Sequence, residues 1–156
     1  MELHKKLLEQ KVNFCNSRNT EMSDEEFAIL LMTFPVFRVA NADDDFDEDE
    51  RDLMANLLYN FLNEIYGNEI NEDQYKNMIS AYLEDFIWIN QHPDWKDKLV
   101  GGLKALCNEF EGLNETVKTM MQEMAEVSEG ESQKETEVIT TISSVLNEEN
   151  DLEELM

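Results

Sequence analysis

The chain is poor in basic residues, glycine and proline. Its 156 residues include 5 glycines, 2 prolines and only 12 lysines and arginines, against 36 aspartates and glutamates. Scarce glycine and proline, together with the absence of strand-like alternation, favour a helical chain. The formal net charge of −24 repels the phosphates of nucleic acids and the headgroups of anionic lipids. Neither is therefore expected as a direct ligand.

Long apolar runs, secretory features and paired cysteines are also missing. No apolar stretch reaches the roughly 18 residues that a membrane span needs, so membrane insertion is not expected. The first ten residues carry lysines but no following apolar core or cleavage site, which argues against a secretory signal. Cys15 and Cys107 lie too far apart to form a metal-ligand or redox pair. We expect two buried thiols in a protein of the cytoplasm.

Apolar and capping residues predict an all-α fold. With 42% apolar residues the chain can bury a core, and we expect one compact domain over residues 1–147 and a frayed acidic tail over 148–156. Four capping residues are each followed three positions later by Glu or Gln: Ser23 with Glu26, Asp47 with Glu50, Asn71 with Gln74, and Ser132 with Glu135. The predicted helices are about seven, over 3–18, 24–42, 48–66, 72–91, 94–111, 115–127 and 133–146.

Three of these helices carry further expectations. The second is apolar nearly all round, which predicts a central buried helix, kinked at Pro35. In the third, we expect the stripe of Leu53, Leu57, Phe61 and Ile65 to face the core. In the fifth, Gly101 and Gly102 each cost about 1 kcal/mol relative to alanine, which indicates close contact with a neighbouring helix or a break.

Residues 43–50, which we name the acidic hinge, contain seven acidic residues and Phe46. The last four acids fall in the first turn of the third helix, where the helix dipole favours negative charge. Asp43 and Asp44 instead follow the end of the second helix, and two carboxylates about 6 Å apart repel by roughly 3 kcal/mol at an effective dielectric near 20. A bound cation would relieve that repulsion; the alternative is a solvated acidic loop.

The C-terminal part of the chain repeats this arrangement. When Glu135 is aligned with Glu50, Val138, Ile142 and Leu146 fall on the third helix's stripe. The sequence therefore predicts two pseudo-repeated helical hairpins with acidic loops. The candidate cation ligands come from both copies and are Asp43, Asp45, Asp47, Glu50, Glu129 and Glu135. Such hard oxygen ligands favour Ca²⁺ or Mg²⁺. The hinge is not an EF-hand, because its sixth and twelfth positions, counted from Asp43, are Glu48 and Met54.

The run from Ala42 to Glu50 resembles the motif of the TerB-like family of tellurite-resistance and stress-response proteins. That motif reads Ala-Asp-Gly, any residue, aliphatic, three of any kind, then Glu, after a buried helix. Here Asp44 stands in place of the glycine, and the second copy has a short loop without the aliphatic residue. The resemblance covers residues 25–146. It implies a compact all-helical fold, acidic residues proposed to bind divalent metal, a cytoplasmic location, partners at membranes or in signalling, and no established catalytic reaction.

The leading hypothesis is a non-enzymatic stress or defence protein that uses its acidic face, with or without a divalent metal, to dock a protein partner. No nucleophile elbow, phosphate loop or dinucleotide fingerprint is present. The main alternative is an acidic imitation of nucleic acid that inhibits a DNA-binding protein, which the net charge suits. A metal-dependent hydrolase is a third possibility.

Overall fold

The computed structural model describes residues 3–42, 44, 46–127 and 133–147. These residues form α-helices and one short 3₁₀ helix, without a strand among them. The α-helices are α1 (Lys5–Arg18), α2 (Asp24–Ala40), α3 (Glu48–Tyr66), α4 (Glu72–Asn90), α5 (Pro93–Glu109), α6 (Leu113–Val127) and α7 (Gln133–Asn147); the 3₁₀ helix is Gly67–Glu69. The prediction of an all-α fold with about seven helices is confirmed. The acidic tail lies outside the described residues.

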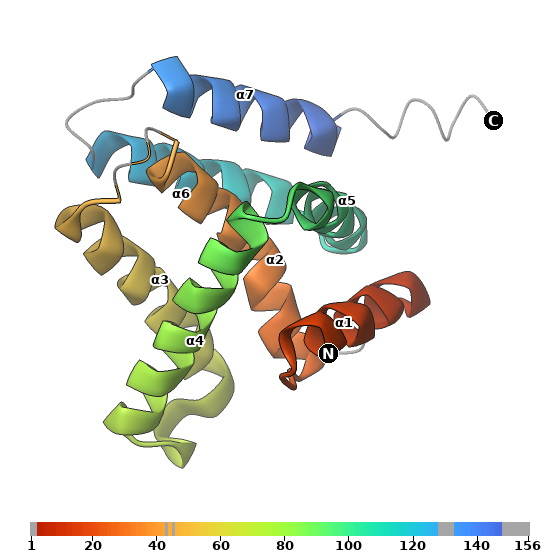
Figure 1. Cartoon of the computed structure of the whole chain (residues 1–156), viewed down its shortest axis with the longest axis vertical. Helices are drawn as coiled ribbons and strands as arrows, with labels where there is room; N and C mark the ends of the chain where they lie inside the picture. Colours follow the sequence, from red (N-terminus) through yellow and green to blue (C-terminus); the bar gives the residue numbers. More distant parts are fainter. Residues whose placement is uncertain (1–2, 43, 45, 128–132, 148–156) are drawn as a thin grey trace.

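Helix α2 is the centre of the molecule. Twelve of its residues are buried, and it contacts each of the other α-helices (Figure 1). The helix continues through Pro35, while the hydroxyl of Thr33 donates to the carbonyl of Ile29 at 2.6 Å. A helix that is apolar on all sides can be stable in water only when other elements cover every face. The other six helices provide that cover.

The capping boxes predicted at three helix starts are present. Ser23 with Glu26 begins α2, Asp47 with Glu50 begins α3, and Asn71 with Gln74 begins α4; in each pair both reciprocal hydrogen bonds form. The fourth predicted box, which begins with Ser132, lies partly outside the described residues. Gly67 follows α3 with a φ of +51°, the left-handed region that glycine adopts without strain.

The face of α3 that lies deepest in the core differs from the predicted one. Met54, Leu58 and Leu62 are completely buried, whereas the stripe that contains Leu53 and Leu57 is half-buried at the edge of the core. The prediction of a core position was therefore correct only in part. Both stripes belong to one wide apolar face, and the packing of α3 on α2 decides which part of it is innermost.

Helices α2 and α3 form one hairpin, and α6 and α7 form another. The partners in each hairpin contact one another, and α2 packs directly on both α6 and α7. Figure 1 shows α7 lying alongside α6 at one end of the molecule, with α3 and α4 extending toward the opposite end. Two packed hairpins agree with the internal repeat read from the sequence.

Candidate functional site

The acidic hinge is anchored by an aromatic side chain. Phe46 packs edge-on against Phe37 of α2, with ring centroids 5.3 Å apart, and the guanidinium of Arg51 lies 5.2 Å from the centroid of the Phe46 ring. Phe46 thereby joins the end of α2 to the first turn of α3. Phe46 is consequently held on the core by apolar and cation–π contacts, although most of its neighbours in the sequence are charged.

Asp44 has a left-handed backbone. Its φ is +59°, and its amide donates to the carbonyl of Asn41 at 3.0 Å, which closes a turn just after α2. Residues with a side chain rarely adopt this conformation, and aspartate and asparagine tolerate it better than most. It is also the position at which the TerB-like motif has glycine.

Two of the predicted ligand residues form the capping box of α3. The amide of Glu50 donates to Asp47 Oδ1 at 2.8 Å, and the amide of Asp47 donates to Glu50 Oε1 at 2.9 Å. One oxygen of each carboxylate is therefore engaged with the backbone. The helix start alone explains the presence of these two acids.

Glu50 and Glu135 are buried at equivalent places in the two hairpins. Each is the third residue of its helix, and their exposed fractions are 2% and 1%. The sequence repeat, which aligned these two glutamates, therefore matches a structural equivalence. The match does not extend to the apolar stripe, because Ile142 and Leu146 are buried in α7 whereas Leu57 and Phe61 are half-buried in α3.

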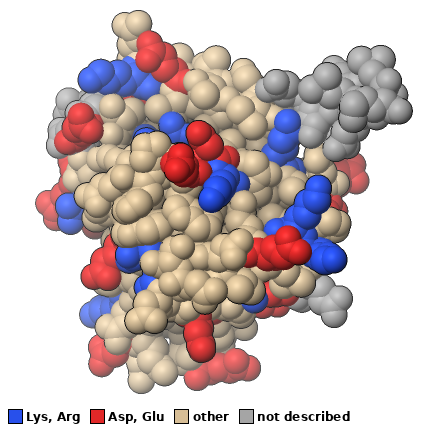
Figure 2. All heavy atoms as spheres, turned by 45° about the vertical axis from the view of Figure 1, so that its right-hand side comes forward, with Lys and Arg blue, Asp and Glu red and all other residues tan. Residues whose placement is uncertain are grey.

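The remaining described acids of the hinge face the solvent. They are Asp44, Asp47, Glu48 and Asp49. Among the described helices, α1 alone carries more basic than acidic residues, four against one. Figure 2 shows a face on which lysines and arginines are interspersed with aspartates and glutamates. The acidic hinge is thus a local concentration of charge, and negative charge does not extend unbroken over the face shown.

The described acids do not by themselves form a cation site. Of the six predicted ligands, Asp43, Asp45 and Glu129 lie outside the described residues. Among the residues that are described, no three histidine, cysteine, aspartate or glutamate side chains gather at metal-binding distance. Asp47 and Glu50 already bond to backbone amides. The acids that the structure describes therefore do not make up a divalent-cation site by themselves, and a site at the hinge would need the acids outside the described residues.

A buried ion pair was not predicted from the sequence. Asp85 of α4 is 6% exposed, and its Oδ1 accepts from Arg18 Nε of α1 at 2.8 Å. Burial raises the pKa of Asp85, and the guanidinium of Arg18 partly opposes that rise. Arg18 also lies over the Trp88 ring, 5.1 Å from its centroid. The two partners are 67 positions apart, so no local pattern could have paired them.

The two cysteines and His92 have side chains that pack against other parts of the fold. Cys15 is buried and Cys107 is partly buried, so the expectation of two buried thiols is correct for Cys15 only. Burial raises the pKa of both thiols, that of Cys107 to about 11. Both thiols are therefore protonated near neutral pH and are weak nucleophiles. His92 stands just before α5, with its ring stacked on that of Trp88 at a centroid distance of 4.0 Å.

Within the described ranges, no helix has both the length and the apolar character needed to cross a membrane. A scan against protein-family models, a search of curated proteins and a search of solved structures each returned no match to this chain.

Proposed function

We propose that this protein is a non-enzymatic, TerB-like docking protein of the cytoplasm that presents its acidic hinge to a basic surface of a protein partner in a stress or defence pathway. The observation that carries the proposal is the combination of a fixed frame with exposed charge. Phe46 ties the hinge to α2, and the capping box fixes the first turn of α3. Four solvent-facing acids stand on that frame.

The part of the hinge that the structure describes suits recognition because its backbone is held in place. The backbone of the described hinge residues is held by its own hydrogen bonds, so a partner binds it with little loss of conformational entropy. Clustered like charges attract a basic surface over a distance and raise the rate of association. The left-handed turn at Asp44, where the TerB-like motif has glycine, supports the resemblance.

A divalent cation is part of the proposal only through the acids of the hinge that the structure does not describe. If Ca²⁺ or Mg²⁺ binds the folded chain and not the unfolded chain, the thermal midpoint will rise with cation concentration. Replacing Asp43 and Asp45 with asparagine then abolishes that rise. An unchanged midpoint at millimolar concentrations of both cations would remove the metal from the proposal and leave the docking surface intact.

The docking surface is tested with two matched double variants. Glu48→Gln with Asp49→Asn neutralises the first two residues of α3, and Glu72→Gln with Asp73→Asn neutralises the first two of α4. All four side chains are exposed, both helices begin with a capping box, and each variant removes two negative charges. The full chain and both variants are used to isolate partners from a lysate of the source organism, and salt is then titrated over the complexes.

We expect the α3 variant to lose most of the partner and the α4 variant to retain it. Equal losses from both variants would show that total charge, and not the hinge, governs binding. Recovery of a DNA-binding protein whose complex dissociates steeply with salt would favour the nucleic-acid imitation.

A further inference from the structure

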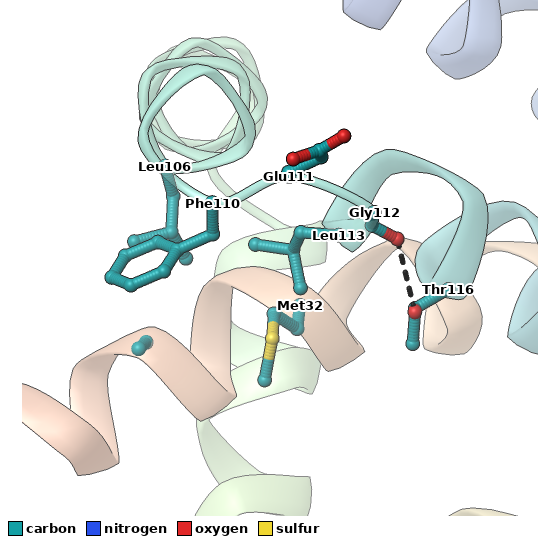
Figure 3. Close-up of a pocket in the computed structure, with 8 residues that line it drawn as sticks. Met32, Leu106, Phe110, Glu111, Gly112, Leu113 and Thr116 are labelled. Carbon is teal, nitrogen blue, oxygen red and sulfur yellow. Dashed lines mark hydrogen bonds between the residues drawn. The ribbon is translucent and has the colours of Figure 1, made fainter.

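An apolar groove opens beside the first half of α2. It has a volume of about 340 Å³ and is lined by Ala28 and Met32 of α2, by Leu106 and Phe110 at the end of α5, and by Glu111, Gly112, Leu113 and Thr116 around the start of α6. Figure 3 shows Leu113 pointing toward Met32 and the Phe110 ring lying over Leu106. The acidic hinge, by contrast, follows the last residue of α2. The two surfaces are therefore separate.

The groove keeps large apolar side chains in contact with water. Phe110 is 40% exposed, and Met32 and Leu113 are half-buried. The Thr116 hydroxyl donates to the Gly112 carbonyl at 3.1 Å, so this polar group is already satisfied within the turn. An open apolar trough of this size suits a leucine-sized or phenylalanine-sized side chain of another protein.

The turn that forms one wall of the groove is backbone-constrained. Gly112 has a φ of +85°, and the amide of Leu113 donates to the Phe110 carbonyl at 3.2 Å. Phe110 is thus held at the mouth of the groove by the chain on both sides of it. A fixed aromatic residue at the rim is the kind of contact that contributes strongly to binding.

The charges around the groove select the occupant. Glu109, Glu111 and Glu115 lie within seven residues of one another, and all three are exposed. Glu111 lines the groove, and it is the charged residue among those that do. Glu115 is paired with Lys118 at 3.8 Å, so Glu111 and Glu109 supply the negative charge beside the groove. These carboxylates favour lysine and arginine beside the inserted apolar side chain.

We propose that this groove binds an amphipathic, basic segment of a protein partner, with one large apolar side chain inserted between Met32, Phe110 and Leu113. The proposal does not depend on the acidic hinge. Both surfaces would attract basic partners, but the groove adds an apolar contact that salt does not weaken.

The test uses a synthetic helical peptide of leucine and lysine, and a second peptide in which glutamate replaces every lysine. Each is titrated into the full chain, with labelled methionine methyl groups and backbone amides, near physiological ionic strength, where exposed charges act over only about 8 Å. We expect the leucine–lysine peptide to shift the signals of Met32, Phe110 and Leu113, and the glutamate peptide to leave them unchanged. Shifts confined to residues 44–50 would overturn the proposal, because the peptide would then be bound by hinge charge alone.

Two single variants distinguish peptide binding in the groove from nonspecific binding to exposed apolar residues. Phe110→Ala removes the ring at the mouth of the groove and should lower the affinity for the leucine–lysine peptide roughly tenfold. Ile87→Ala is the matched control, because Ile87 is 50% exposed on α4 and does not line the groove. Binding within about twofold of the unmodified chain is expected for this control. Equal weakening by both variants would contradict the proposal.

A third variant, which ends at residue 147, examines a different occupant. The last nine residues include Leu152, Leu155 and Met156, and the other six are five acids and Asn150. Unchanged peptide affinity after their removal supports a groove open to partners. A large gain in affinity, with shifts of Met32 and Leu113 on truncation alone, would show that the chain's own tail fills the groove and would overturn the proposal.

Discussion

Adjacent glycines in α5 should respond to alanine in opposite ways. Gly101 is exposed, and a Cβ built on it meets nothing within 4 Å. At Gly102, a Cβ would collide with Gln10 Oε1 of α1 and lie 3.2 Å from Leu31 Cδ2 of α2. Both positions lie in the same helix and gain equally in helix propensity when alanine replaces glycine. The difference between the two variants therefore reports the close approach of α1 and α2 to Gly102.

The magnitudes follow from the contacts. Alanine stabilises a helix interior by about 1 kcal/mol relative to glycine, and Gly101→Ala should gain that amount. Gly102→Ala gains the same, but Gln10 must move and give up the hydrogen bond from its Nε2 to the Lys98 carbonyl, 2.8 Å long and worth about 1 kcal/mol. Crowding of Leu31 adds roughly 1–3 kcal/mol, while Gln10 Oε1, buried without a partner, regains water. We expect a net loss of about 1 kcal/mol.

The free energy of unfolding is measured by urea denaturation, followed by far-ultraviolet circular dichroism. The expected separation between the two variants is about 2 kcal/mol, with an unchanged dependence on urea concentration. Gln10→Ala combined with Gly102→Ala should recover part of the loss, since the colliding side chain is gone. If Gly102→Ala stabilises the protein as much as Gly101→Ala does, the close contacts of Gln10 and Leu31 with Gly102 are contradicted.

Two further predictions concern stability. Leu58→Ala empties a completely buried site in α3 and should lower the free energy of unfolding by about 2–5 kcal/mol. Leu57→Ala, at the half-buried edge of the core, should lower it by less than about 2 kcal/mol. Equal losses in chemical denaturation would contradict the assignment of the buried face of α3. Lys11 Nζ lies 2.7 Å from Asp24 Oδ1 and holds the pKa of Asp24 below its usual value. The Asp24 carboxylate therefore stabilises the fold at pH values above its unfolded pKa of about 3.9. This contribution is lost as the pH falls through the lower pKa of the folded state. Asp24→Asn should therefore cost up to about 1 kcal/mol at neutral pH and almost nothing in strong acid; a cost independent of pH in urea titrations would refute the linkage.

Local sequence determined the helix starts because capping is a local interaction. The capping side chain accepts a hydrogen bond from the amide three positions later at Ser23, Asp47 and Asn71. Residues three positions apart are therefore enough to predict where these helices begin. A helix end is also set locally where glycine takes a positive φ, as Gly67 does after α3. The predicted start of α3 agrees with the structure to the residue.

Long-range packing was beyond reach of the same reasoning. The apolar face of α3 is two stripes wide, and only its contact with α2 determines that Leu58 is innermost and Leu57 peripheral. For the same reason, the scarce glycines of α5 indicated a close approach without showing that Gly102 alone makes it. The pair of Arg18 and Asp85 and the groove at Phe110 both combine segments far apart in the sequence.

The acidic hinge shows how one residue type serves two purposes. The starts of α3 and α4 are locally alike, since each has a capping box followed by two exposed acids. Acids in these places stabilise any helix through its dipole, so their presence alone implies no partner. Two features distinguish α3. One is its surroundings: the left-handed turn at Asp44 and the packing of Phe46 on Phe37. The other is charge, because the capping box of α3 is the acidic pair Asp47 and Glu50, whereas that of α4 is the neutral pair Asn71 and Gln74. If the hinge recognises a partner and the start of α4 does not, the cause must lie in these surroundings or in the two additional carboxylates.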